Sequence, residues 1–223
     1  MVGFTACDSF LDEDPKSSLT LDTYYKTSAD IIGNVNYLYR DGAPDKMGNM
    51  TGAYRGSSLS VMNMVTGYFV NEYEGQEVDC SYARQLTRQD FTQSCCNYLT
   101  NDTWKSCYKS INVANAVIKY VDGVEMDNQA QYKAEARFFR ALNYFYLVKM
   151  FGDVPMVTEP TEDATLVEYP TRTAASEVFN TVIIPDLQFA VENLPNATFA
   201  GNSHRVTKYA ADMLLADVYM RLG

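Results

Sequence analysis

The sequence predicts an all-α protein, a tetratricopeptide-like helical scaffold with long inserted loops. Apolar residues recur at helical spacing in five separate segments of the chain. Small residues such as Ala210 and Ala211 stand where neighbouring helices would approach closely. No segment has an alternation of apolar and polar residues strong enough to propose a central sheet. Helix pairs of this kind stack on one another, although their period here is irregular.

The first helix is predicted between Ser28, its N-cap, and Gly42, which stands just past its end. The second is predicted to begin at Asn101 or Asp102 and to end at Gly123. Both have an apolar stripe on one face. In the first helix these residues are Ile31, Ile32, Val35, Leu38 and Tyr39, and in the second they are Trp104, Tyr108, Ile111, Val117, Ile118 and Val121.

A third, unusually aromatic helix is predicted from Asp127 to Gly152, where the chain leaves it in an extended form. Its apolar residues lie nearly all round, so we expect neighbours on several sides and a packing role for most of its aromatic rings. These residues are Tyr132, Ala136, Phe139, Leu142, Phe145, Tyr146 and Val148. Glu135, Arg137 and Arg140 are interpreted as buried or half-buried partners that lock helices, without a catalytic role.

Two further helices follow. Thr173 is predicted to cap the first, and Pro185 to bend or interrupt it because proline lacks a backbone N–H. Thr207 is predicted to cap the second. The residues expected to pack are Val178, Val182, Leu187, Ala190, Val191 and Leu194 in the first, and Ala210, Ala211, Leu214, Leu215, Val218 and Leu222 in the second.

Between residues 41 and 103 the helical pattern weakens, which is typical of a functional loop region or of short helices. Residues 68–98 mix aromatic side chains with amides, carboxylates and guanidinium groups. Aromatic faces bind the C–H patches of sugar rings, while the polar groups bind hydroxyls. The predicted ligand-binding residues are Tyr73, Tyr82, Arg84, Phe91 and Tyr98. The alternative is that half or more of these aromatic side chains cover the scaffold.

Charge and residue counts exclude several classes of function. The formal charge of −10 and the pI near 4.6 would repel a phosphate backbone, so no nucleic-acid partner is expected. His204 is the one histidine, which rules out His-x-x-x-His zinc motifs, and we interpret it as a surface residue. The cysteines lack a C-x-x-C pair, and neither a metal nor a cofactor is predicted. Any disulfides among Cys80, Cys95, Cys96 and Cys107 stay open.

Residues 1–18 are predicted to precede a helical domain at 19–223. Residues 1–6 are apolar or small and lead directly to Cys7, after which the chain turns acidic. Small residues before a cleavage point are typical of a secretory signal, and those before Cys7 resemble the end of a bacterial lipoprotein signal. We therefore predict a signal-peptide remnant, a lipidation cysteine and a tether; a buried N-terminal cysteine is the alternative.

Several segments resemble one protein family. "AEARFFRALNYFYLVKMFGDVPMVTEP" is similar to the hallmark segment of the RagB/SusD-like outer-membrane lipoproteins of Bacteroidota. "DTWKSCYKSINVANAVI", "IIPDLQFAVENLP", "HRVTKYAADMLLADVYMRLG" and "CDSFLDEDPKS" resemble other segments of the same family, in the family's order and over nearly the whole chain.

The resemblance implies a non-enzymatic, surface-exposed lipoprotein, anchored in the outer membrane through Cys7. Such a protein captures glycans and delivers them to a SusC-like TonB-dependent transporter. The resemblance also implies a longer protein, of which residues 19–223 are the N-terminal helical domain. Two alternatives remain. One is a protein-interaction scaffold or peptide-binding lid of the transporter, and the other, a glycoside hydrolase, is the weakest because nothing marks a catalytic carboxylate pair.

Overall fold

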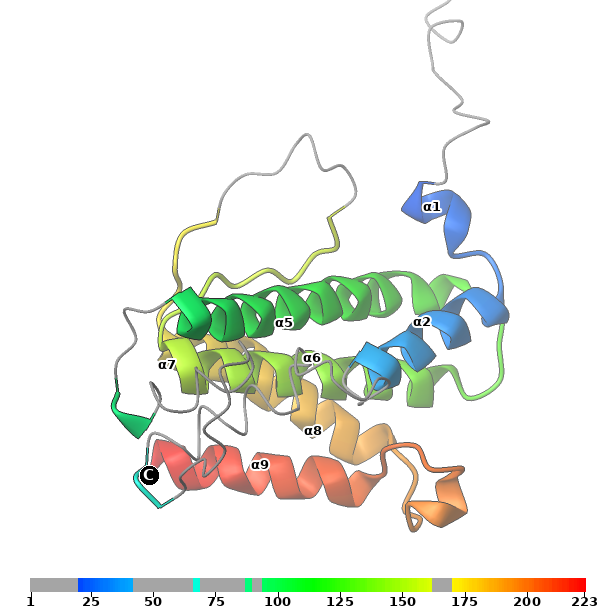
Figure 1. Cartoon of the computed structure of the whole chain (residues 1–223). Helices are drawn as coiled ribbons and strands as arrows, with labels where there is room; N and C mark the ends of the chain where they lie inside the picture. Colours follow the sequence, from blue (N-terminus) through cyan, green and yellow to red (C-terminus); the bar gives the residue numbers. More distant parts are fainter. Residues whose placement is uncertain (1–19, 42–65, 69–86, 90–93, 162–169) are drawn as a thin grey trace, which may run out of the picture.

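The computed structural model describes residues 20–41, 66–68, 87–89, 94–161 and 170–223, and its elements are helical (Figure 1). In chain order they are α1 (Leu21–Tyr24), α2 (Ser28–Asp41), α5 (Ser94–Tyr120), η2 (Val121–Gly123), α6 (Gln129–Phe151), α7 (Ala175–Val178), the π-helical segment η4 (Phe179–Ile183), α8 (Ile184–Asn193), η5 (Ala200–Asn202) and α9 (Lys208–Leu222). Within these ranges, strand-like pairing is limited to one antiparallel bridge between Val154 and Thr173. The predicted all-α class is confirmed.

Helix α6 lies at the centre of the bundle. It packs against α2 and α5 on one side and against α7, η4, α8 and α9 on the other. Figure 1 shows α5 and α6 side by side, α8 crossing next to α6, and α9 beyond α8. Because every side of α6 has a neighbour, most of its side chains are buried. The predicted packing role of its aromatic residues is thereby confirmed.

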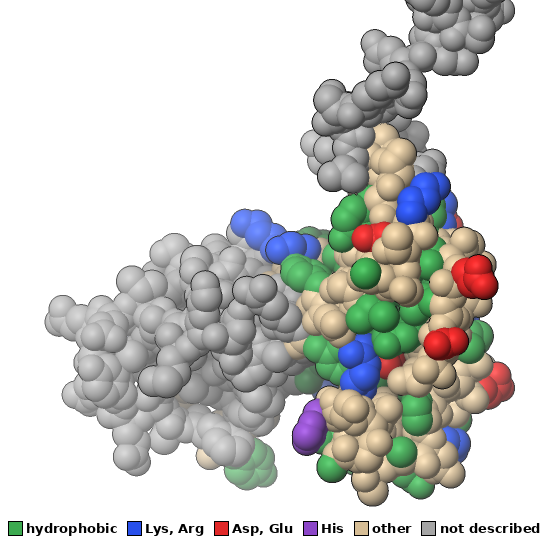
Figure 2. Space-filling view, turned by 90° about the vertical axis from the view of Figure 1, so that its right-hand side faces the viewer, with side chains coloured by type: hydrophobic (Ala, Val, Ile, Leu, Met, Phe, Trp, Pro, Cys, Tyr) green, Lys and Arg blue, Asp and Glu red, His purple; other side chains and the backbone are tan. Residues whose placement is uncertain are grey.

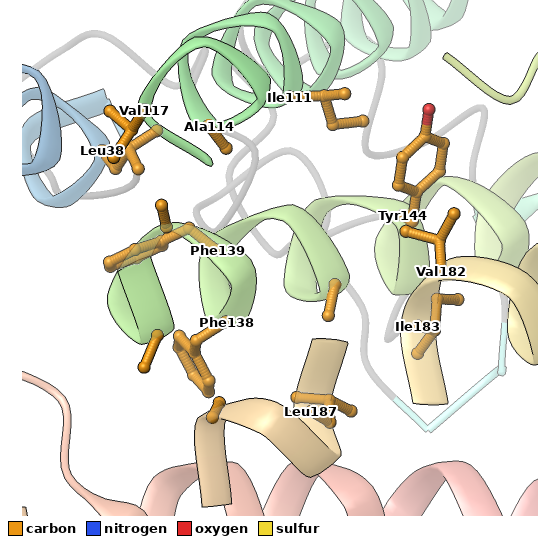
Figure 3. Packing of buried hydrophobic residues seen from close by; sticks show 14 of the residues in the cluster. Leu38, Ile111, Ala114, Val117, Phe138, Phe139, Tyr144, Val182, Ile183 and Leu187 are labelled. Carbon is orange, nitrogen blue, oxygen red and sulfur yellow. The ribbon is translucent and has the colours of Figure 1, made fainter. Parts of the chain in front are cut away.

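The core joins these helices through large apolar side chains (Figure 3). Leu38 of α2 meets Val117 of α5, whereas Phe138 of α6 points toward α8. Both Leu38 and Val117 are fully buried, as is Leu187 of α8. Burying one such side chain contributes about 1.5–3 kcal/mol. Within the part of the chain that the structure describes, no helix is both long and apolar enough to cross a membrane.

Helix α2 begins at Ser28, one position before the predicted start, so Ser28 is not its N-cap. Thr27 takes that place. Its N–H and its hydroxyl donate to Asp30 Oδ2 at 2.8 and 2.7 Å, and the Asp30 N–H donates back to Thr27 Oγ1 at 3.4 Å. These hydrogen bonds hold the pKa of Asp30 below its usual value. Gly42 lies outside the described residues.

The predicted start of α5 was wrong. The helix begins at Ser94, so Asn101 and Asp102 are interior residues and not caps. Its first turns carry polar residues and no apolar stripe, which is why periodicity missed them. The end was closer to the prediction, because α5 stops at Tyr120 and a 3₁₀ turn continues to Gly123.

Helix α6 is capped by Asn128 in a left-handed conformation, φ 56°, and not by Asp127. Gly152 ends the helix as predicted, with φ 68° and ψ −124°. Beyond it the chain is extended, and we call residues 154–161 the strap. The strap lies along α5 and α6, which hold it by hydrogen bonds from their side chains.

The next helix is capped by Ala174, because the predicted cap, Thr173, pairs with Val154 instead. Pro185 stands in the first turn of α8, directly after the π-helical segment, so the predicted interruption is confirmed. Thr207 is the N-cap of α9, as predicted. Ala211 and Val218 are buried, but Leu222 is 47% exposed and does not pack as expected.

Candidate functional site

The predicted ligand-binding residues lie almost wholly outside the described residues. Tyr73, Tyr82, Arg84 and Phe91 fall in undescribed segments, as does Cys7. Tyr98 belongs to the first turns of α5, where the backbone but not the side chain is described. The described structure therefore provides the frame on which this region is mounted, with α5 as the direct connection.

Six residues after Tyr98, α5 contributes the only tryptophan of the chain to an aromatic cluster. Trp104 is half-buried, and its ring lies 4.9 Å from that of Tyr108 and 5.1 Å from that of Phe151. The Arg172 guanidinium stands 5.9 Å from the Trp104 ring. Aromatic faces beside a guanidinium are the groups that sugar C–H patches and hydroxyls require.

Arg172 and Asp153 fix the end of α6 next to this cluster. The exposed Arg172 donates to the carbonyls of Phe151 and Asp153 through Nη1. The Asp153 carboxylate accepts from the Ala175 N–H at 2.9 Å, at the start of α7. Because its own bonds are to backbone carbonyls, Arg172 positions the chain around Gly152 as well as facing Trp104.

Tyrosine hydroxyls bind the main chain of the strap. The Tyr108 hydroxyl donates to the Pro155 carbonyl at 2.7 Å. The Tyr144 hydroxyl donates to the Val157 carbonyl at 2.9 Å and accepts from the Val157 N–H at 2.7 Å. Burial raises the pKa of Tyr144 to about 12 and also raises the pKa of Tyr108.

Asn115 connects the strap to a buried ion pair. Its Nδ2 donates to the carbonyls of Val157 and Glu159 at 3.0 and 3.2 Å, while its Oδ1 accepts from Arg140 Nη1 at 2.9 Å. Arg140 also donates to both oxygens of Asp186, at 2.6 and 2.9 Å. A polar chain thus runs from α8 through α6 and α5 to the strap, and each of its members is buried.

In this polar chain of side chains, the charge of Asp186 is opposed by nearby arginines. Burial raises the pKa of Asp186, and the hydrogen bonds and charge of Arg140 oppose that rise. Arg137 adds a second cation 3.8 Å from Asp186 and lies over the Phe189 ring. The predicted helix-locking role of Arg137 and Arg140 is confirmed. Asn115 and Asp186 were not predicted as partners of Arg140, although both lie in segments that resemble the family.

Glu135 forms a second lock on α6. It is fully buried, and both its oxygens accept from Arg205 Nε at 3.0 Å. The Tyr39 hydroxyl donates to Glu135 at 2.8 Å and accepts from the Val206 N–H at 2.9 Å. Arg205 also lies over the rings of Tyr39 and Tyr132. These contacts join α2, α6 and the loop before α9, as the locking role predicted for Glu135 requires.

The described part of the chain holds no group of three His, Cys, Asp or Glu side chains that could bind a metal. His204 is exposed, as predicted, and its ring stands edge-on to Phe199 (Figure 2, purple). Cys107 is buried. Among the described residues, the two buried carboxylates, Asp186 and Glu135, are each paired with an arginine.

Comparison with known proteins identifies the family to which the chain belongs. A family model described as "Starch-binding associating with outer membrane" matches residues 9–220. The chain belongs to this SusD-like family. Tetratricopeptide-like scaffolds with the same arrangement of helices occur among its solved members, so the fold predicted from the motifs is confirmed.

The relatives extend well beyond this chain. SusD-like protein P25 of Formosa agariphila is 26% identical over 97% of the chain and 40% of its own length. A SusD superfamily protein from Parabacteroides distasonis is 28% identical, with a TM-score of 0.67 over 85% of this chain and 38% of that one. A laminarin-binding SusD-like protein is 23% identical and shares the fold, with a TM-score of 0.66 over 88% of this chain and 40% of that one. The chain spans about 40% of the length of the curated relatives.

Proposed function

We propose that this SusD-like protein captures oligosaccharides or polysaccharides at the cell surface and delivers them to a SusC-like TonB-dependent transporter. The match of residues 9–220 to a starch-binding, outer-membrane-associated family carries the proposal. The fold shared with a laminarin-binding protein supports the same class of ligand. No catalytic step is assigned, and the protein acts by binding.

The binding surface combines the loop region with the frame described above. Tyr73, Tyr82, Arg84, Phe91 and Tyr98 supply the aromatic faces and a guanidinium group. Their region leads into α5, which the strap and the Arg140–Asp186 pair hold in place. A rigid frame lowers the entropy cost of ordering loop side chains on a ligand.

Affinity gels with laminarin, xyloglucan and starch test glycan capture. We expect at least one polysaccharide to retard the protein, and a variant with Tyr73, Tyr82 and Tyr98 changed to Ala to migrate freely while its circular dichroism is unchanged. Tyr209→Ala is the matched control, because this tyrosine is 54% exposed on α9. If the wild type is retarded by no polysaccharide, even in a wider set of gels, the proposal of glycan capture is wrong. The protein-binding scaffold is then the favoured function.

Membrane attachment is tested at Cys7. We expect the full-length protein, expressed in a Bacteroidota host, to carry a lipid detectable by mass spectrometry and to be cut by protease added to intact cells. Cys7→Ala should abolish the lipid and release the protein from the outer membrane fraction. A lipid-free protein that stays in that fraction would contradict anchoring through Cys7.

Delivery requires a complex with the transporter. We expect the full-length protein to copurify with a SusC-like barrel from detergent extracts of outer membrane, and uptake of the bound glycan to fall when the lipoprotein gene is deleted. Unchanged uptake in that strain would contradict delivery, even if glycan binding were intact.

A further inference from the structure

The loop between α8 and α9, residues 194–207, presents an aromatic pair at the surface. Phe199 is 58% exposed. The ring of His204, which is also exposed, stands edge-on to it with 5.2 Å between the ring centroids. Figure 2 shows His204 on the surface in purple. One exposed aromatic ring is ordinary in a folded protein, so the argument for a site depends on how the loop holds the pair.

The backbone holds the pair in a strained conformation. Ser203 and His204 are consecutive residues with positive φ, 51° and 60°. Nowhere else in the described ranges do two neighbouring residues other than glycine share this feature. A Cβ is disfavoured in left-handed backbone, and glycine is the residue most often found there. Strain of this kind persists where the surrounding structure fixes it, and it gathers at binding sites.

Hydrogen bonds inside the loop supply that fixing. The His204 N–H donates to the Phe199 carbonyl at 2.9 Å and closes the turn between the two rings. The Asn202 N–H donates to the Thr198 carbonyl at 3.0 Å, and Asn202 Nδ2 donates to the Val206 carbonyl at 2.9 Å. The pair therefore has its geometry before a ligand arrives, which lowers the entropy cost of binding.

The sequence around Phe199 is polar but uncharged. Residues 194–204 contain no Asp, Glu, Lys or Arg, although these make up 21% of the chain. Amides, hydroxyls and an imidazole take their place, in Asn196, Thr198, Asn202, Ser203 and His204. An aromatic face suits the C–H patch of a sugar ring, and neutral polar groups suit its hydroxyls. A protein interface would need a larger apolar centre, so this composition favours a neutral sugar.

The loop lies far from Tyr98, the one predicted ligand-binding residue whose backbone is described. Figure 1 shows the start of α5, which contains Tyr98, at one end of the bundle and η5 toward the other. Helix α5 has 27 residues, so it is about 40 Å long. A sugar bound at the loop is therefore not the sugar bound near Tyr98, although one long glycan chain can supply both.

We propose that Phe199 and His204 form a second glycan contact, which takes a sugar ring of a neutral polysaccharide whose chain is also held near Tyr98. The inference rests on the proposed function, because it adds a contact for the same ligand. Phe199 supplies the face for C–H groups, and His204 positions that ring and hydrogen-bonds a hydroxyl. Two weak contacts joined by one chain raise the affinity only for chains that reach both.

Chain length separates the second contact from the first. The probes are whichever of laminarin, xyloglucan or starch retards the wild type, and its short form: laminaritriose, a xyloglucan heptasaccharide or maltotriose. We expect Phe199→Ala to weaken binding of the polysaccharide at least threefold in affinity gels, and to leave calorimetric binding of the short form unchanged. Phe199→Trp should keep both, and Tyr209→Ala, exposed on α9, is the control.

The outcomes are distinct. If Phe199→Ala is retarded like the wild type, the second contact is overturned and the proposed function stands. If its binding of the short form falls as well, Phe199 belongs to the first contact and the second is overturned. A wild type that no polysaccharide retards overturns both the second contact and the proposed function.

Thermal unfolding separates a ligand contact from a structural role. Ser203→Gly relieves strain without removing either ring, so the melting temperature should rise by about 2–4 °C while the affinity for the polysaccharide is kept. His204→Gly should lower that affinity at least twofold without lowering the melting temperature. If Phe199→Ala and His204→Gly lose affinity only together with a fall in melting temperature, the pair is structural and the second contact is overturned.

Discussion

At the scale of single residues, the buried Asn115 makes three hydrogen bonds through its side chain. Arg140 fixes its amide so that both Nδ2 hydrogens point to carbonyls of the strap. Asn115→Ala removes the hydrogen bonds to Arg140 Nη1 and to the Glu159 carbonyl and leaves the Val157 carbonyl to the Tyr144 hydroxyl alone. A buried polar group left without a partner costs about 1–3 kcal/mol. We expect the free energy of unfolding to fall by at least about 2 kcal/mol, measured by urea titration of Trp104 fluorescence.

The exposed Asn196 provides the control. Asn196→Ala should change the free energy of unfolding by less than about 0.5 kcal/mol, as is usual at the surface. If Asn115→Ala also stays within that limit, the contacts between Asn115 and the strap do not contribute to stability.

The Arg140–Asp186 pair makes a different prediction. Removing one member of a buried ion pair strands the other charge, and Arg140→Met or Asp186→Leu alone should cost about 3–5 kcal/mol. Replacing both removes the stranded charge, so the double variant should be more stable than either single one. This follows from the raised pKa of Asp186, which indicates that burial of its charge is costly. Urea titrations of the three variants measure the coupling, and additive losses would contradict it.

At the scale of elements, substitutions at two glycines distinguish the effect of backbone strain from that of helix propensity. Gly33 lies inside α2 and Gly152 ends α6, and an added Cβ meets nothing within 4 Å at either. Gly152 has φ 68° and ψ −124°, where other residues are strained by about 1–3 kcal/mol. Gly152→Ala should therefore destabilise the protein. Gly33→Ala should instead stabilise it by about 0.5–1 kcal/mol, because alanine favours the helix. Thermal unfolding followed by circular dichroism checks both signs, and destabilisation by Gly33→Ala would contradict the second.

Elements rich in apolar residues at helical spacing were predictable from the sequence. The body of α6 and its end at Gly152 follow directly from periodicity and a glycine past the last helical turn. The start of α5 was not predictable, because residues 94–103 lack an apolar stripe. They are the N-terminal extension of a helix whose apolar stripe begins at Trp104. Caps were off by one residue at Ser28 and Thr173, since a neighbouring residue takes the place of each as N-cap.

The candidate site was less predictable than the fold. Glu135, Arg137 and Arg140 were assigned to locking because they interrupt an otherwise apolar helix. Their partners Asp186 and Arg205 lie 46 and 70 residues away along the chain, and a single sequence carries no signal that pairs such distant charges. The residues predicted to bind ligand stay a prediction, because they lie outside the described structure or, for Tyr98, lack a described side chain.

At the scale of the whole molecule, the bundle depends on α6 as the element that every other layer contacts directly or through one neighbour. Its two polar locks face different partners, with Glu135 tied to α2 and the loop before α9, and Arg140 tied to α5 and α8. Apolar contacts supply most of the stability of such a bundle, whereas paired charges restrict which helices pack together.

Net charge adds a prediction about which glycans bind. The chain carries a formal charge of −10, so its field lowers the concentration of polyanions near the surface. If laminarin is retained, we expect carboxymethylated laminarin to bind more weakly in affinity gels at low ionic strength. Raising the salt to about 0.3 M shortens the screening length to roughly 6 Å and should recover part of the loss. A carboxymethylated glycan that binds more tightly at low salt would instead require a cluster of cations at the binding surface that overcomes the charge of the whole chain.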